Sequence, residues 1–241
     1  MTMTAARPLT DLPATLRATL PRHIAFIADG NRRWAADHGL TVEQGYEAGT
    51  AAVHAAIQQC RDLGVQAVSV FIASERNFDR PPAHVAALVK VVCGLVRTAA
   101  ANADGPVRVI GDLTRVPLPL IDAIETAEKE TAGLTGMSVC LGIGYDGQAD
   151  IRRAAHRALL APGRNKREAQ LALGQFLSTR GLPELDLVVR TSGERRLSGF
   201  LLYEAADATL HFDDRMWPEW DDAALLEALA VHAAQTRKFG R

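Results

Sequence analysis

Three short segments of the sequence combine arginines with small hydrogen-bonding residues, and each directly follows an apolar run. They are residues 29–34 (DGNRRW), 74–80 (SERNFDR) and 190–198 (RTSGERRLS). Guanidinium groups, hydroxyls and backbone N–H groups are the donors that phosphate oxygens need. The sequence therefore predicts a site for phosphate groups, provided that the fold brings the three segments together.

The first of these segments also contains a carboxylate, Asp29. Gly30 would let the backbone approach a ligand closely, and Asn31 can cap a helix whose N-terminus favours an anion. Negative charge makes chemical sense there if a divalent cation bridges Asp29 and a diphosphate. The alternative is that Asp29 only caps a helix and that the arginines pair with surface acids. One cluster alone would not decide, but three at one end of a sheet favour the phosphate site.

Short apolar runs and longer amphipathic patterns alternate along the chain. Strands are expected at residues 23–28, 67–73, 107–111, 138–143, 185–190 and 209–212, and helices near 43–63, 84–103, 118–133, 147–161, 165–178 and 221–237. This alternation is typical of an α/β fold with a parallel sheet between two layers of helices. Ligands of such sheets bind beyond the carboxyl ends of the strands, where the three segments should meet. We expect one domain over residues 21–241, preceded by a loose lead-in over residues 1–20.

Composition restricts the classes of partner and compartment. The net charge of the 241 residues is −1, so no global field attracts nucleic acid or an acidic membrane surface. Cys60, Cys93 and Cys140 lie far apart in apolar runs, as expected of reduced buried thiols. No signal-peptide pattern and no uninterrupted run of about 18 apolar residues is found, which predicts no transmembrane segment and a cytoplasmic protein.

The sequence GIGYDG at residues 142–147 matches the G-x-G-x-x-G spacing of dinucleotide-binding loops. It follows the fourth expected strand rather than the first, and the acidic residue some 20 positions on, Glu168, lies in a helical pattern. Turn glycines are therefore the preferred interpretation.

Several long motifs, in the same order, resemble the cis-prenyltransferases, the undecaprenyl diphosphate synthase family. The resemblance extends from about residue 20 to the end of the chain. The segments that carry it are HIAFIADGNRRWA (23–35), SERNFDRP (74–81), RVIGD (108–112), RTSGERRLSGFLLYEAADATLHFDDRMWPEW (190–220) and RKFG (237–240).

This resemblance implies a six-stranded, mainly parallel sheet, a homodimer, and Mg²⁺-dependent coupling of an allylic diphosphate to isopentenyl diphosphate. It implies that Asp29 holds Mg²⁺ and assists the departure of the allylic diphosphate. Other implied site residues fall into two groups. Residues near the place of proton loss would be Ser74, Asn77 and Arg80. Substrate-binding residues would be Gly30, Asn31 and Arg33 for the allylic diphosphate, and Arg190, Arg196 and Ser198 for the second diphosphate. Arg32, Trp34 and Tyr46 are further candidates for substrate binding.

The apolar face of the helix expected at 84–103 would line a tunnel for the prenyl chain. Its residues are Val85, Leu88, Val92 and Leu95, and ordinary core packing is the alternative at each position.

The chain departs from the family pattern at positions within the site. Arg32 replaces a glycine, Tyr46 a histidine, Val42 an arginine, and Thr209 a glutamate that usually helps to hold Mg²⁺. Further departures are Arg76, Phe78, Ser192 and Gly199, together with Ile72 near a usually small tunnel residue.

These departures from the family pattern lie at the expected reacting centre, which favours a reaction different from the usual one of the family. The hypothesis is a short-chain enzyme that couples two small isoprenyl diphosphates irregularly, head to middle, as in the lavandulyl and cyclolavandulyl branch of the family. One alternative is a regular cis-prenyl diphosphate synthase that uses isopentenyl diphosphate. Another is a non-catalytic partner subunit, although such subunits usually lose the aspartate that Asp29 retains. The proton acceptor stays open among Ser74, Glu75, Tyr46 and the diphosphate itself.

Overall fold

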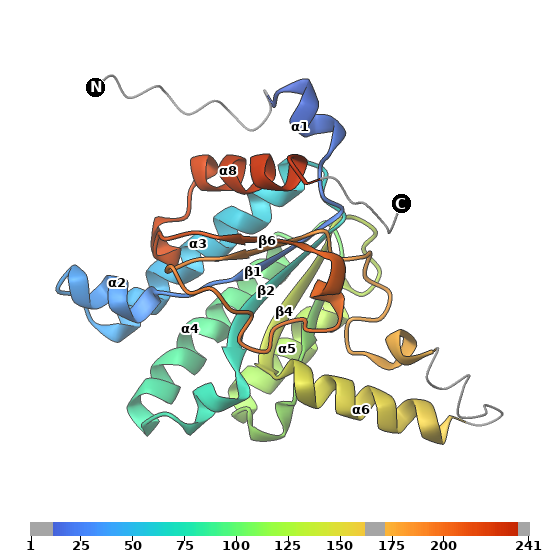
Figure 1. The fold of residues 1–241 in the computed structure, drawn as a ribbon. Coiled ribbons are helices and arrows are strands. Elements are labelled where there is room, and N and C mark those ends of the chain that lie inside the picture. Colours follow the sequence, from blue (N-terminus) through green and yellow to red (C-terminus); the bar gives the residue numbers. More distant parts are fainter. Residues whose placement is uncertain (1–11, 162–171, 236–241) are drawn as a thin grey trace.

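Six parallel strands form the central sheet of the protein (Figure 1), in the order β3-β4-β2-β1-β5-β6. The computed structural model describes residues 12–161 and 172–235. The strands are β1 (His23–Ile27), β2 (Ala67–Ser74), β3 (Val107–Ile110), β4 (Ser138–Tyr145), β5 (Leu187–Arg190) and β6 (Thr209–Phe212). The α/β fold is thus confirmed, with every strand pair parallel. Each strand begins and ends within two residues of its predicted limits.

Helices join the strands. They are α1 (Ala14–Ala18), α2 (Asn31–Asp37), α3 (Val42–Asp62), α4 (Pro82–Ala101), α5 (Leu118–Thr131), α6 (Gly147–Leu160) and α8 (Asp222–Ala233). Short 3₁₀ turns include η2 (Glu75–Asp79) and η4 (Leu173–Phe176). The sequence pattern does not predict α2 as an element of its own. Of the helix predicted at 165–178, residues 165–171 lie outside the described residues, and the remainder contains only η4. Within the expected lead-in, α1 contacts α8.

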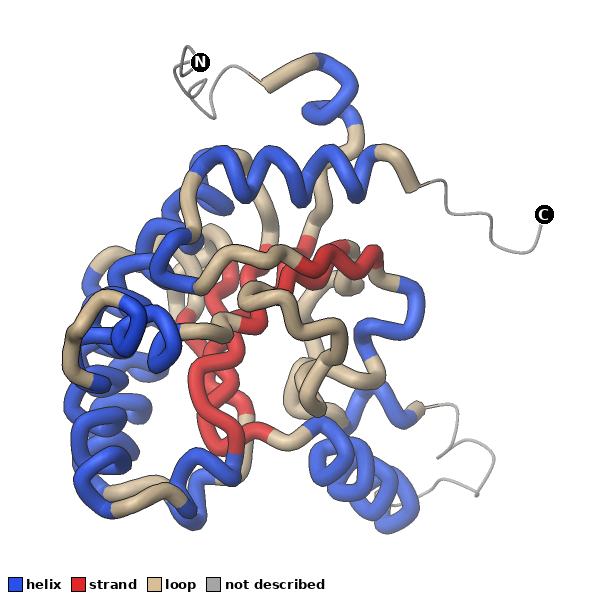
Figure 2. Tube along the Cα trace, turned by 60° about the vertical axis from the view of Figure 1, so that its left-hand side comes forward, coloured by secondary structure: helices blue, strands red, loops and turns tan. Residues whose placement is uncertain are grey.

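Alternate residues of β1 serve the two faces of the sheet. Ile24 and Phe26 belong to the larger core beneath α3, α4, α5 and α8, whereas Ala25 and Ile27 belong to a smaller core on the opposite face. The turned view in Figure 2 shows the strands between the thick helical layer and a thinner layer of loops and short helices. All five residues of β1 are buried, and apart from His23 they are apolar, as expected of a strand covered on both faces.

By length and hydropathy, α4 is the one candidate for a membrane span within the described residues, with 39% of its 18-residue window buried. Leu88, Val92 and Leu95 of this helix are buried in the larger core. An apolar helix in such a position is accounted for by packing against the sheet and α5.

The glycines of the GIGYDG segment lie where the backbone is crowded. A Cβ at Gly144 would be 2.4 Å from the Asp112 carbonyl oxygen, and one at Gly147 would be 2.4 Å from that of Gly199. Close backbone packing accounts for glycine at both positions.

His23 begins β1 and is only 1% exposed. Its Nδ1 lies 3.1 Å from the Pro183 carbonyl oxygen and its Nε2 lies 2.8 Å from Ser69 Oγ. A neutral ring satisfies both contacts, with Nδ1–H donating to Pro183 and Nε2 accepting from the hydroxyl. Burial lowers the pKa of His23 to about 4, although the Pro183 bond and Asp186 oppose this shift.

Because the pKa of His23 is lower in the folded chain than in the unfolded chain, its contribution to stability is present above about pH 6.5 and is lost towards pH 4. We expect this group to remove about 3 kcal/mol of unfolding free energy over that range. Denaturant titrations at several pH values measure the loss. The variant His23→Gln should flatten the dependence, and the exposed His156→Gln should not. An equal slope in all three proteins would contradict this assignment.

Candidate functional site

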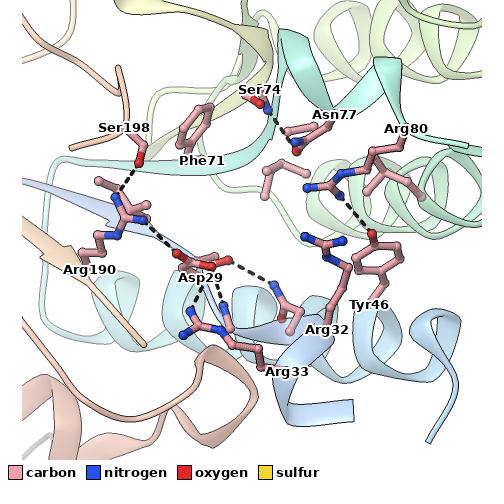
Figure 3. Close-up of a pocket in the computed structure, with 17 residues that line it drawn as sticks. Asp29, Arg32, Arg33, Tyr46, Phe71, Ser74, Asn77, Arg80, Arg190 and Ser198 are labelled. Atoms are coloured by element: carbon pink, nitrogen blue, oxygen red, sulfur yellow. Dashed lines mark hydrogen bonds and ion pairs between the residues drawn. The ribbon is translucent and has the colours of Figure 1, made fainter. Parts of the chain in front are cut away.

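A cavity of about 320 Å³ opens at the carboxyl ends of β1, β2 and β5 (Figure 3). The three segments predicted from the sequence all contribute to it. Its polar lining residues are Asp29, Gly30, Asn31, Arg32, Arg33, Tyr46, Ser74, Asn77, Arg80, Arg190 and Ser198. The parallel register explains the convergence, because Ile27 at the end of β1 pairs with Arg190 at the end of β5 and with Phe71 in the last half of β2.

The backbone of Asp29 is held by hydrogen bonds with residues of two other segments. Its N–H donates to Thr191 Oγ1 at 3.1 Å, and its carbonyl oxygen accepts from the Trp217 N–H at 2.9 Å. Gly30 follows with φ of 106°, and a Cβ there would lie 2.8 Å from Met216 Sδ. Only glycine therefore fits the turn that starts α2 directly after the carboxylate.

The Asp29 carboxylate makes a hydrogen-bonded ion pair with Arg190. Oδ2 accepts from Arg190 Nη2 at 2.8 Å, and Oδ1 accepts from the Gly30 N–H at 2.7 Å. Arg33 Nη2 lies 3.7 Å from Oδ1. Partial burial acts to raise the pKa of Asp29, but Arg190, the Gly30 N–H and Arg33 outweigh it, so the net pKa is lowered. The carboxylate is therefore ionised at neutral pH and available to a cation.

Arg190 connects the two sides of this end of the cavity. Its side chain is 3% exposed, and Nη1 donates to Ser198 Oγ at 2.6 Å and to the Arg196 carbonyl oxygen. Its Nε is buried without a hydrogen-bond partner among the described residues. A buried guanidinium with one unused donor is suited to an additional anion.

Tyr46 and Arg80 form the opposite wall. Arg80 Nη1 donates to Tyr46 Oη at 3.0 Å, which joins α3 to the residue after η2. The Ser74 N–H donates to Asn77 Oδ1 at 3.2 Å, which fixes the turn between them. Of the three side chains considered as proton acceptors, Ser74 and Tyr46 line the cavity, whereas Glu75 does not.

Two residues predicted to bind substrate have side chains outside the cavity lining. Trp34 stacks on His38, with ring centroids 4.4 Å apart. The Arg196 guanidinium pairs with Glu194, and only its carbonyl oxygen reaches Arg190. Their roles in binding stay predictions.

Thr209 does not lie where its alignment with a metal-binding glutamate suggested. It begins β6 opposite Leu187, whereas the site lies beyond Arg190 and Phe212, at the other end of the same strands. Its Oγ1 is 3.1 Å from His232 Nδ1. Within this chain Thr209 therefore lies at the end of β6 that points away from the cavity, and its relation to a metal ion stays open.

Asp29 supplies the one carboxylate among the residues that line the cavity. No group of three or more metal-binding side chains occurs among the described residues. Mg²⁺ commonly binds through one or two carboxylates together with substrate phosphates and water. The residues present fit a magnesium ion that binds with a diphosphate, and do not fit a metal held by protein ligands alone.

A narrow apolar extension of about 40 Å³ continues from the cavity between α3 and α4. Leu88, Val92 and Leu95 line it as the sequence predicted, together with Ile72, and Val85 does not. Its lining also includes Val53 and Trp217. The volume accommodates roughly three water-sized groups.

Two aromatic residues of the site were missed from the sequence. Phe71 lines both cavities and stacks on Phe200 with ring centroids 4.6 Å apart. Trp217 donates from Nε1 to the Gly49 carbonyl oxygen at 2.9 Å. Phe71 lies in an expected strand and Trp217 in a long motif, but an apolar residue in either setting carries no signal that separates lining from core.

The fold and the site together define a parallel α/β protein with a cationic cavity for phosphate groups, a single carboxylate, and an apolar extension. The sequence model described as "Putative undecaprenyl diphosphate synthase" matches residues 27–240. The chain belongs to this family of cis-prenyltransferases, and it is a prenyltransferase.

Curated relatives agree over nearly the whole length. "Isoprenyl transferase 1" of Streptomyces avermitilis is 36% identical, with 92% of this chain and 89% of the relative covered. The "Short-chain Z-isoprenyl diphosphate synthase" of Mycobacterium bovis is 34% identical, with 95% and 91% covered. A solved structure of lavandulyl diphosphate synthase from Lavandula x intermedia, in complex with dimethylallyl diphosphate, has a TM-score of 0.83 at 30% identity and covers 93% of this chain and 100% of that chain.

The position of the Asn31 side chain depends on the close approach of α2 and α3. Asn31 Nδ2 donates to the Ala28 carbonyl oxygen at 3.0 Å. A Cβ at Gly49 would lie 2.0 Å from Asn31 Oδ1, so an alanine at this position must displace the Asn31 side chain.

We therefore expect Gly49→Ala to destabilise the fold by about 1–3 kcal/mol through overpacking. We also expect it to lower kcat/KM about 100-fold, because the Asn31 side chain is displaced from the cavity lining. Gly94→Ala in α4 is the matched control, because a Cβ there meets nothing within 4 Å. It should stabilise the fold by about 0.5–1 kcal/mol and leave turnover unchanged. Thermal unfolding and steady-state kinetics measure both effects. Equal behaviour of the two variants would contradict the packing argument.

Proposed function

We propose that this chain is a short-chain isoprenyl diphosphate synthase that couples two dimethylallyl diphosphate molecules head to middle and releases diphosphate. The observation that carries the short chain is the apolar extension of about 40 Å³ beside the cationic cavity. A five-carbon unit that lies partly in the larger cavity and ends in this extension suits the volume, whereas a long prenyl chain does not.

Irregular coupling is supported by the similarity to one solved structure and by residues that line the cavity. The similar lavandulyl diphosphate synthase was solved in complex with dimethylallyl diphosphate. Three departures from the family pattern line the cavity, namely Arg32, Ile72 and Tyr46, and Tyr46 carries the hydrogen bond to Arg80. A differently placed acceptor needs such a rebuilt wall.

The chemistry follows from charge. When bound, Mg²⁺ would be held by Asp29 and substrate oxygens and would neutralise charge on the departing diphosphate. The allylic C–O bond breaks with its electron pair on that diphosphate, and the acceptor double bond supplies the pair for the new C–C bond. Arg33 stabilises the leaving charge without rearrangement, because its contact to Ser192 at 2.7 Å already orients it. Arg190, which Ser198 orients at 2.6 Å, is placed for the second diphosphate. A proton then leaves the coupled skeleton, with Ser74, Tyr46 and the released diphosphate as the acceptors within the cavity.

A regular synthase is the second candidate. It is favoured by the identity with the short-chain Z-isoprenyl diphosphate synthase of Mycobacterium bovis. In that case isopentenyl diphosphate is the acceptor, and the departures tune chain length. A non-catalytic subunit is disfavoured because Asp29, Arg33, Arg190 and Ser198 all reach one cavity.

The homodimeric state and the cytoplasmic location are proposals that rest on the family resemblance and the sequence pattern. Size-exclusion chromatography with light scattering tests the first, and cell fractionation tests the second.

Product analysis decides between the two reactions. With Mg²⁺ and dimethylallyl diphosphate alone, we expect a branched or cyclic ten-carbon alcohol after dephosphorylation, detected by gas chromatography with mass detection. Linear Z-alcohols that form only after isopentenyl diphosphate is added would replace the proposal by the regular reaction. The absence of product from every allylic diphosphate would reject both.

Asp29→Ala should lower kcat at least about 100- to 1000-fold, because it removes the single carboxylate of the cavity. Asp37→Ala is the control, since Asp37 is an exposed carboxylate at the end of α2. Circular dichroism must show both variants folded, because the buried Arg190 loses its acidic partner in the first. Near-normal turnover by folded Asp29→Ala would remove Asp29 from the mechanism.

A further inference from the structure

The cationic cavity is electrostatically uneven. Its lining contains four arginines and one carboxylate. Asp29 is shared by Arg190 at 2.8 Å and Arg33 at 3.7 Å, so both arginines at this end have an acidic partner. At the other end, Arg32 and Arg80 have no ion pair with any described residue.

Figure 3 shows the side chains of Arg32 and Arg80 directed towards each other, beside Tyr46 and away from Asp29. They come from different elements, since Arg32 lies in the first turn of α2 and Arg80 follows η2. Two guanidinium groups that share a cavity wall repel one another unless an anion lies between them. The fold fixes the Arg80 side of this pair, because Tyr46 is buried and anchors Arg80 at 3.0 Å, whereas Arg32 is exposed and lines the same cavity.

The donors around this space match a diphosphate. Each guanidinium presents a planar fork of N–H groups. Tyr46 Oη accepts from Arg80 and still has its own O–H to donate. The wall therefore offers positive charge and directed donors, and its own residues contain no carboxylate that would need a metal ion to join it to an anion.

We infer that Arg32 acts as a built-in cation which, with Arg80 and Tyr46, binds the diphosphate of one substrate without a divalent ion. The metal requirement of the enzyme then belongs to the Asp29 end alone. This inference rests on the proposed function for the identity of the substrate, but the binding of the diphosphate group is measurable without it.

The test uses inorganic pyrophosphate as the probe, titrated calorimetrically into the purified chain in EDTA at fixed ionic strength. The wild-type chain should bind it. Arg32→Ala should weaken binding about 10-fold or more, as expected for the loss of a charge-assisted contact, and Arg32→Lys should fall between them. Arg76→Ala is the matched control, because Arg76 is an exposed arginine of η2 outside the cavity lining.

A second readout is the Mg²⁺ concentration that gives half-maximal turnover, which Arg32→Ala should raise. Unchanged pyrophosphate affinity in Arg32→Ala, or no binding by the wild-type chain in EDTA, would overturn the inference. Either result leaves the proposed reaction intact if product still forms. Conversely, failure to make any prenyl product rejects the proposed function while the pyrophosphate titration still judges Arg32.

Discussion

The ion pair between Asp29 and Arg190 is the interaction on which the site depends. It joins the ends of two adjacent central strands, and it buries a guanidinium to 3% exposure. Removing such a charge from water is costly unless its partners are well placed. Asp29, Ser198 and the Arg196 carbonyl oxygen satisfy Arg190 from three directions. The conformation of the loop after β5 is therefore tied to the carboxylate that begins the site.

The surrounding backbone explains why this pair can be maintained. The N–H of Ser192 donates to the Arg215 carbonyl oxygen at 2.6 Å, and that of Gly193 donates to the Asp213 carbonyl oxygen at 2.9 Å. Ser192 and Gly193 both have positive φ, 76° and 73°. A strained non-glycine residue at this position persists only because neighbouring segments determine it. The loop after β6 thus holds the loop after β5, and Trp217 extends the same support to Asp29.

The sequence was sufficient for the fold because its strands are buried on both faces and interrupted by amphipathic helices. It was also sufficient for Asp29, Arg80 and Arg190 to be placed in one cavity, since parallel strands bring their carboxyl ends together. The sequence could not predict in which direction a side chain beyond the end of a strand or helix points. Arg196 turns towards Glu194, and position in a motif does not reveal this. Thr209 illustrates a different limit, because the motif gives its position in the chain but does not reveal that it begins β6, at the end of the strand away from the cavity.

The bond from Trp217 to the Gly49 carbonyl oxygen has an evolutionary consequence. Trp217 is 1% exposed, lines the apolar extension, packs against Phe26 of the core, and is stacked on Trp220. A smaller residue there would enlarge the extension and at the same time leave a cavity in the core, which typically costs about 3–5 kcal/mol for loss of a large aromatic side chain. Leu95 and Val92 belong to the same core and extension. For an enzyme with the short product proposed above, we expect variants that make longer products to need added stability elsewhere in the fold, which would link product length to thermal tolerance.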